Sequence, residues 1–252
     1  CLGVVWVGLI GTYKMIVNSV SGYVNLIFNS VISSFGNLIA TESREKQFQL
    51  FLVYRFFAIW VYGFSAVGFF LLLSPLVELY VGADRVLATS IIAWYLTDYF
   101  FKGERVVLSN FKTAAGVFEQ DKYLSILQGI VNLVLSIALV FKIGLAGVFI
   151  GTVLSGLIAN ITKPIIIYRV CFEKSAISYF QESIKYLLVI GAALAVLIPL
   201  QNLLMPQVTI AKFALMIVII TVVFNGIFLV VFGRTEEFKY LYGMVKGRWK
   251  RS

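Results

Sequence analysis

The sequence contains no histidine and little cysteine, proline or charge. There are two cysteines and four prolines, and charged residues make up only 13% of the 252 residues. Without imidazole, the usual histidine routes to metal binding and to triad catalysis are closed. Two cysteines far apart in the chain, Cys1 and Cys171, give no disulfide framework. We therefore expect no metal site, no cofactor and no disulfide scaffold.

Apolar side chains are abundant instead. Hydrophobic residues make up 60% of the chain and the mean hydropathy is +0.94, whereas soluble proteins are roughly 45–50% apolar and 25% charged. A soluble fold of this size cannot bury so much apolar surface. The apolar runs extend over about 20 residues, enough for a helix to cross a ~30 Å hydrocarbon core, whereas barrel strands alternate over about 10. The sequence predicts an all-α polytopic transmembrane helix bundle.

About seven membrane spans are predicted from these runs. They are 11–40, 50–73, 87–113, 123–142, 145–168, 184–200 and 208–232. Residues 1–169 are expected to form one unit of five spans, and 170–252 to add two spans and a basic cytoplasmic tail. Because the chain begins with Cys-Leu-Gly rather than Met, we expect it to be the C-terminal part of a longer protein.

Lysine and arginine are unevenly divided between the two ends of these spans. Most of the 21 lie nearer the end that carries connections 41–49, 114–122 and 169–183 and the C-terminal tail. The opposite end has only Lys14, Arg85, Lys142 and Lys212. The positive-inside rule therefore places the first end, and with it the C-terminus, in the cytoplasm. The same rule explains the net charge of +9 without nucleic acid as a partner.

Two segments are expected at the membrane surface rather than across it. In the tail, apolar residues recur at helical spacing: Phe238, Leu241, Tyr242, Val245 and Trp249. Basic residues fill the positions between them: Lys239, Lys246, Arg248 and Lys250. This pattern predicts an amphipathic helix that can lie on an anionic leaflet. On the other side, Ser74–Gly82 is expected to be an interfacial turn that Pro75 opens.

A charged stripe runs along the predicted span 87–113. Asp98, Lys102 and Arg105 follow i, i+4, i+7 spacing and share one helix face, whereas Glu104 lies on another. Asp98 can pair with Lys102, which leaves Arg105 as a surplus cation. Charges are costly at membrane depth and usually face a bundle interior or a water-filled cavity. We expect this face to line a cavity, with Lys102 about 16 Å from the span's end and near the midplane.

A second stripe, on span 11–40, consists mainly of amides. Its members at helical spacing include Lys14, Asn18, Asn25 and Asn29. Asparagines at this spacing can serve helix packing as well as cavity lining, and both interpretations stay open. Together with a guanidinium, such amides suit an anionic, hydroxyl-rich ligand such as a sugar phosphate.

The remaining polar and small residues of the spans are expected to anchor or pack helices. Arg55 and Lys163 lie near a cytoplasmic end, so their side chains can extend to the headgroups. Asn132 is expected to link helices. Small residues at close-packing spacing open span 145–168: Gly144, Gly147, Gly151 and Ser155.

No enzyme motif is present in the sequence. It contains no P-loop, no nucleophile elbow and no metal-ligand spacing. The predicted outer connections are too short for a catalytic domain. Deep charges without soluble domains favour a transporter over an enzyme.

Three stretches carry a family resemblance. They read NSVISSFGNLIATESREK at 29–46, ERVVLSNFKTAAGVFEQDKY at 104–123 and GLAGVFIGT at 144–152. In their order and spacing, the chain resembles over about 1–190 the C-terminal half of bacterial Wzx-type polysaccharide flippases, in the superfamily of the MATE exporters. The resemblance implies two six-helix lobes around a cavity, often with two further helices. Residues 1–169 would be most of the second lobe, and the N-terminal lobe would be missing.

The resemblance also implies a function. Such proteins move undecaprenyl-pyrophosphate-linked oligosaccharide units from the cytoplasmic to the periplasmic leaflet of the bacterial inner membrane, for O-antigen and other surface polysaccharides. Alternating access of the lobes would carry the headgroup across. The cations would hold the pyrophosphate: Arg105 and Lys102, with Lys14 as a weaker candidate. The cavity for the glycan would be lined by Asp98, Asn18, Asn25 and Asn29.

Other classes make different demands on the sequence. A MATE-like, cation-coupled exporter of small molecules needs uncompensated membrane carboxylates, and Asp98, the best candidate, has Lys102 beside it. A membrane polysaccharide polymerase or glycosyltransferase needs a large outer loop or a carboxylate cluster at an interface. A scaffolding protein would leave the deep cations unexplained.

Overall fold

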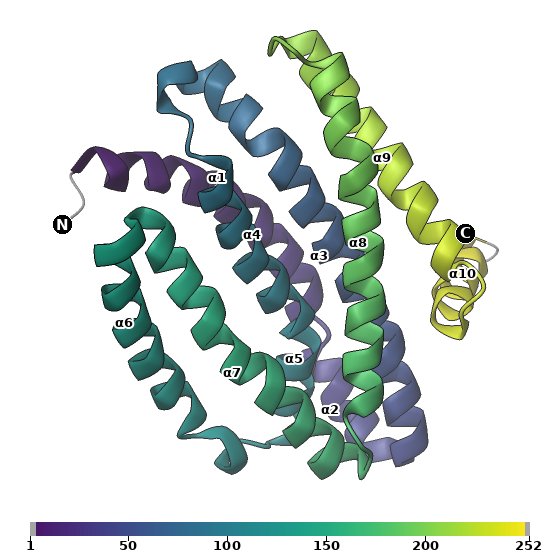
Figure 1. Cartoon of the computed structure of the whole chain (residues 1–252). Helices are drawn as coiled ribbons and strands as arrows, with labels where there is room; N and C mark the ends of the chain where they lie inside the picture. The colour runs from purple at the N-terminus through teal and green to yellow at the C-terminus, as the bar shows by residue number, and fades with distance from the viewer. Residues whose placement is uncertain (1–3, 250–252) are drawn as a thin grey trace.

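A computed structural model of the chain describes residues 4–249, without the side chains of residues 4, 5, 7, 121, 245, 248 and 249. This part of the chain is an all-α bundle with no β-strand (Figure 1), as predicted. Its helices are α1 (Val4–Asn29), α2 (Ile32–Thr41), α3 (Arg44–Val81), α4 (Thr89–Glu104), α5 (Val106–Ala115), α6 (Leu124–Ile143), α7 (Leu145–Phe172), α8 (Ile177–Leu204), α9 (Ile210–Phe232) and α10 (Glu236–Trp249). Two short 3₁₀ turns complete it, η1 (Ala83–Arg85) and η2 (Glu119–Asp121).

Six helical segments in the described part are long and apolar enough to cross a membrane, compared with about seven predicted. They are Gly8–Thr41, Arg44–Val81, Leu124–Ile143, Leu145–Phe172, Ile177–Leu204 and Ile210–Phe232. The expected span 87–113 is instead divided into α4 and α5 by a one-residue break at Arg105. Neither piece alone reaches the ~20 residues that a crossing needs.

Three prolines lie inside helices: Pro75 in α3, Pro164 in α7 and Pro199 in α8. Helix α3 continues through Pro75 to Val81 and ends at Gly82, whose φ of 110° is readily available only to glycine. The prediction that Ser74–Gly82 forms a separate interfacial turn is therefore wrong. Helix α7 likewise continues through Pro164 to Phe172. Neighbouring helices can satisfy the backbone groups that a proline frees within a spanning helix.

The connections lie at two ends of the bundle, as the predicted order of spans requires. Figure 1 shows the α3–α4, α6–α7 and α8–α9 connections at one end and the α2–α3, α5–α6 and α7–α8 connections at the other. Ion pairs link two connections at this second end: Arg44 contacts Glu173, and the Lys174 ammonium lies 3.3 Å from Glu45. We call this the basic end, because the sequence places most Lys and Arg there.

Helices α6 and α7 form a close pair. A side chain at Gly147 or Gly151 would collide with the α6 backbone near Leu139 or Ser136. The Asn132 amide donates to Ser155 Oγ at 3.0 Å and to Thr152 at 3.2 Å. The predicted packing role of these residues is confirmed. Gly144 differs, because it forms the turn between the helices with φ 65° and ψ −143°.

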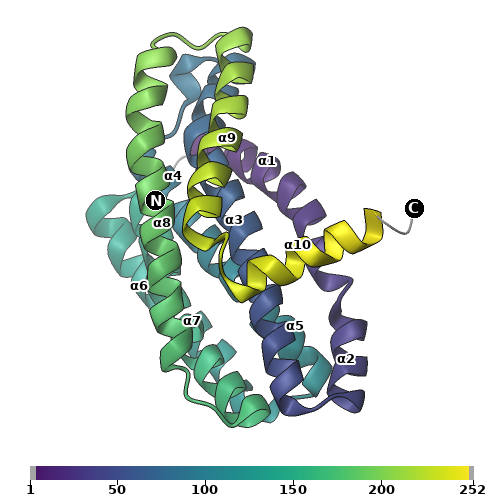
Figure 2. The same ribbon diagram turned by 90° about the vertical axis from the view of Figure 1, so that its right-hand side faces the viewer.

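Helices α8 and α9 pack against α3 through aromatic rings. Phe56 lies 5.4 Å from Phe228 and 5.9 Å from Phe232, between ring centroids. Helix α10 then turns across the bundle (Figure 2), as expected for a surface helix, and Phe238 contacts Trp60 at 5.9 Å. The tail positions Val245, Arg248 and Trp249 have no described side chains, and Lys250 and Arg251 lie outside the described residues.

Candidate functional site

Helix α1 has three different faces. One is buried against α3 and α5: Tyr13, Val17, Val24 and Phe28. A second exposes the predicted polar stripe: Lys14, Asn18, Asn25 and Asn29. The third, roughly opposite the stripe, exposes apolar side chains: Val20, Tyr23 and Ile27. Lipid can cover the third face, but amides and an ammonium in hydrocarbon are costly. The polar face therefore requires water or another protein surface.

The predicted amide stripe is joined to α4 through one tyrosine. Tyr62 on α3 is 3% exposed, and its hydroxyl donates to Asn25 Oδ1. The ring of Tyr62 lies so close to Gly103 that a Cβ there would overlap it. Gly103 directly follows Lys102, so the stripe on α1 and the predicted cation on α4 lie at the same level of the bundle.

Lys102 and Asp98 form the ion pair that their spacing predicts. The Lys102 ammonium lies 2.7 Å from Asp98 Oδ2, and its side chain is 60% exposed whereas that of Asp98 is 11% exposed. Asp98, on α4, is thus buried against α7. A Cβ at Gly156 of α7 would lie 4.0 Å from Asp98 Oδ1. Lys102 keeps an accessible ammonium even while it is paired.

Arg105, the second predicted cation, is in a different environment. It is 7% exposed, and its Nη1 donates to the carbonyl oxygen of Gly156 on α7 at 2.9 Å. Because Arg105 occupies the break between α4 and α5, this bond fixes the break against α7. Of the two predicted cations, Lys102 is therefore exposed, whereas Arg105 is buried and holds helices together.

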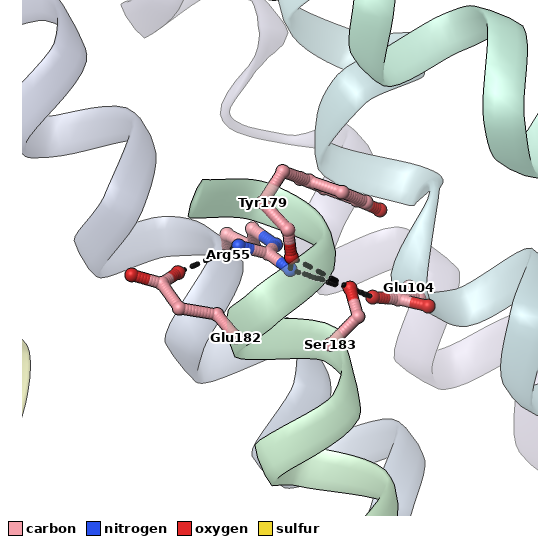
Figure 3. A network of polar contacts seen from close by, with 5 residues as sticks. All are labelled: Arg55, Glu104, Tyr179, Glu182 and Ser183. Carbon is pink, nitrogen blue, oxygen red and sulfur yellow. Dashed lines mark hydrogen bonds and ion pairs between the residues drawn. The ribbon is translucent and has the colours of Figure 1, made fainter. Parts of the chain in front are cut away.

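A larger charged group, which we call the Arg55 network, was not predicted. Figure 3 shows Arg55 between Glu182 on one side and Ser183 and Glu104 on the other. The guanidinium donates to Glu182 at 2.7 Å and to Ser183 Oγ at 2.8 Å, and it reaches Glu104 at 3.4 Å. It also donates to the Tyr179 carbonyl at 2.9 Å and lies 3.7 Å from that ring's centroid.

The expectation that Arg55 extends to the headgroups is therefore wrong. Its side chain is 1% exposed, because carboxylates on α4 and α8 supply the partners that water would otherwise supply. Lys163 likewise reaches a protein partner, with its ammonium 3.1 Å from Ser109 Oγ. One signal could have indicated the network: Glu104 is an acidic residue inside a predicted span and has no cation three or four residues away on its own helix.

Two contacts between α3 and α8 give the distance along the helices from the Arg55 network to the opposite end of the bundle. Arg55 pairs with Glu182, and Gln201 Nε2 donates to the Leu71 carbonyl. At 1.5 Å per residue these contacts lie about 24 Å apart along α3 and about 28 Å along α8, close to a ~30 Å hydrocarbon core. The two contacts are thus separated by most of the thickness of such a core, and the network lies toward the basic end of the bundle, close to Lys102. The position of Lys102 near the midplane stays a prediction.

This arrangement can bind an anion. Lys102 offers an accessible ammonium toward the basic end, and Lys14 offers a second one near the opposite end, where the Tyr13 hydroxyl accepts from the Leu87 backbone. Between them the α1 amides offer donors and acceptors without charge. The carboxylates of the Arg55 network, buried Glu104 and partly buried Glu182, in contrast already have a cationic partner within the described residues.

Comparison with known proteins assigns no family to the chain. No protein-family model matches it, and no curated protein matches it. The resemblance to Wzx-type flippases therefore stays a prediction based on three short stretches of sequence.

Proposed function

We propose that this chain is part of a flippase that moves undecaprenyl-pyrophosphate-linked oligosaccharide units across a bacterial inner membrane, from the cytoplasmic to the periplasmic leaflet. The observation that carries the proposal is the exposed polar face of α1, which lies opposite an apolar face on the same helix. A helix of this kind suits the wall of a hydrophilic path through the bilayer. The opposing wall would come from an N-terminal lobe.

The positions of the exposed cations support a direction of transfer. A lipid-linked pyrophosphate lies at headgroup level, and Lys102 lies toward the basic end, which the charge distribution assigns to the cytoplasm. In our proposal Lys102 receives the pyrophosphate there, and Lys14 meets it near the periplasmic end. Asn18, Asn25 and Asn29 accompany the glycan, and the lipid tail stays in the bilayer. Arg105 positions α4 against α7 and does not contact the substrate in this state.

One observation favours a second candidate, a cation-coupled exporter of small molecules. Glu104 and Glu182 share a single guanidinium, so the Arg55 network holds one more acid than base. Such a group can take up a proton or a cation. The flippase is favoured because the network is buried, whereas the exposed polar residues are the neutral and cationic groups that suit a glycan phosphate.

Replacement of Lys102 tests the proposal. In cells that depend on the intact gene product, Lys102→Gln should abolish the glycan at the cell surface while the protein level in the membrane stays normal, and Lys102→Arg should restore export. Lys185→Gln is the matched control, because Lys185 is exposed on α8 near the same boundary. Unchanged export by Lys102→Gln would refute the phosphate contact. If deletion of the whole gene left the surface glycan unchanged, the exporter would be favoured.

A further inference from the structure

An apolar groove opens at the boundary of the apolar layer, away from the polar face of α1. Its volume is about 600 Å³, within the ~300–1,000 Å³ typical of ligand pockets. Val53, Phe57 and Trp60 of α3 form its floor, Phe35 of α2 forms one wall, and Leu241 and Tyr242 of α10 form the other. Such a lining offers carbon surface to a ligand and almost no hydrogen-bonding groups, which suits a hydrocarbon chain.

The groove lies at the depth of a lipid headgroup and its first methylenes. On α3 its lining extends from Leu50 to Trp60, and this stretch brackets Arg55, toward the basic end of the bundle. The end of α9 lies at the same level, because Phe232 contacts Phe56. The groove thus straddles the boundary between the apolar layer and the headgroups, where tryptophan and tyrosine are favoured.

The helix that forms one wall carries positive charge. Residues 233–252 contain six basic and two acidic residues. Lys239 is exposed and pairs with Glu236 at 2.7 Å, and the Lys246 ammonium lies 5.9 Å from the ring of Tyr242, which lines the groove. A cation therefore lies at the rim of an apolar groove at headgroup depth.

We propose that this groove binds one anionic phospholipid of the leaflet at the basic end, with an acyl chain between α2, α3 and α10 and the phosphate beside Lys246. Charge complementarity selects the headgroup, and the apolar lining holds the chain. The bound lipid would attach α10 to the bundle. The site would prefer its headgroup over the other headgroups of the surrounding bilayer. This site does not depend on the proposed transport function, because none of its lining residues belongs to the polar face of α1 or to the Asp98–Lys102 pair.

Trp60 provides a reporter for the test. It lines the groove, and its indole is held by a 2.8 Å bond from Nε1 to Asn225 Oδ1. A protein with Trp60 as its only tryptophan is made by replacing Trp6, Trp94 and Trp249 with Phe. In phosphatidylcholine vesicles, brominated phosphatidylglycerol should quench Trp60 at a several-fold lower mole fraction than brominated phosphatidylcholine. A control protein that keeps only Trp94, which is 37% exposed on α4, should show no headgroup preference.

Two further variants test the parts of the site. Lys239→Gln with Lys246→Gln should remove most of the preference, since each basic residue near an anionic surface contributes about a fivefold effect. Val53→Phe should fill the groove and weaken quenching by phosphatidylglycerol, whereas Val230→Phe, at an 84% exposed site on α9, should not. Equal quenching by both lipids, or a preference that survives loss of the lysines, would overturn the proposal. Displacement of phosphatidylglycerol by a smaller mole fraction of polyprenyl phosphate would assign the groove to an isoprenoid chain instead.

Discussion

Two groups of polar side chains meet at the end of α4 and differ in burial and in the number of protein partners that they contact. Glu104 belongs to the Arg55 network; Glu104 and Arg55 are buried, and the network joins α4 to α3 and α8. Lys102, two residues earlier, has an exposed ammonium and shares its level with the exposed amides of α1. Gly103 lies between them against Tyr62. The comparison shows that charge at a membrane boundary can fasten helices or remain accessible to a ligand, within one turn of the same helix.

The difference follows from what surrounds each group. A buried charge is tolerated only when it is paired and hydrogen-bonded, and removal of one partner leaves the other uncompensated. An exposed ion pair keeps its hydration, so its loss costs little stability. We therefore expect substitutions in the Arg55 network to change folding, and substitutions on the exposed side to change transport.

The largest effect on stability is expected at Arg55. Arg55→Met should destabilise the protein by about 3–5 kcal/mol, because Glu104 and Glu182 lose their common cation. Thermal unfolding of the purified protein in detergent measures this change. Addition of Glu104→Met to Arg55→Met should recover part of the loss, since it removes one buried acid.

Arg85→Met is the control for that experiment, because Arg85 is 61% exposed and lies 3.9 Å from its acidic neighbour Asp84. It should unfold like the unaltered protein. If Arg55→Met matched this control in stability, the distinction between charges that hold helices together and charges that a ligand can reach would fail.

An intermediate effect is expected at Gly103, which separates the two groups. Gly103→Ala places a methyl group inside the ring of Tyr62, and overpacking of this kind costs about 1–3 kcal/mol. Gly129→Ala on α6 is the matched control, because its methyl group meets no other atom within 4 Å and alanine favours the helix. Equal midpoints of thermal unfolding for the two variants would show that α3 and α4 do not pack this closely.

The smallest effect is expected at Arg44, which forms an exposed ion pair with Glu173. The two side chains are 59% and 71% exposed, so Arg44→Gln should cost less than about 1 kcal/mol. Repetition of the unfolding experiment in high salt should remove even this difference by screening. A loss as large as that of Arg55→Met would mean that connections between helices, rather than the buried network, hold the basic end together.

Much of the fold follows from local patterns in the sequence. Continuous apolar runs predict the spanning helices, the order of these runs predicts which connections share an end, and i, i+4 spacing predicts the Asp98–Lys102 pair. The glycines of α7 predict a close-packing face, and the structure places α6 against it. Each of these inferences needs only residues that are near one another in the chain.

The Arg55 network could not be predicted in this way. Glu104 lies 49 residues from Arg55 and Glu182 lies 127 residues away, so only tertiary packing brings them together. The break at Arg105 has a similar origin, because Glu104 bonds to α3 while Arg105 bonds to Gly156 on α7.

The central claim is that the polar face of α1 borders water within the membrane, and cysteine accessibility tests it most directly. With Cys1 and Cys171 replaced by serine, Asn18→Cys and Val20→Cys place a thiol on opposite faces at one depth, since two residues correspond to about 200° of rotation. The pair Asn29→Cys and Ile27→Cys repeats the comparison nearer the basic end. The account predicts that a membrane-impermeant thiol reagent modifies Asn18→Cys and Asn29→Cys in native membranes and leaves Val20→Cys and Ile27→Cys unmodified. Equal modification within both pairs, or modification of neither asparagine position, would contradict it.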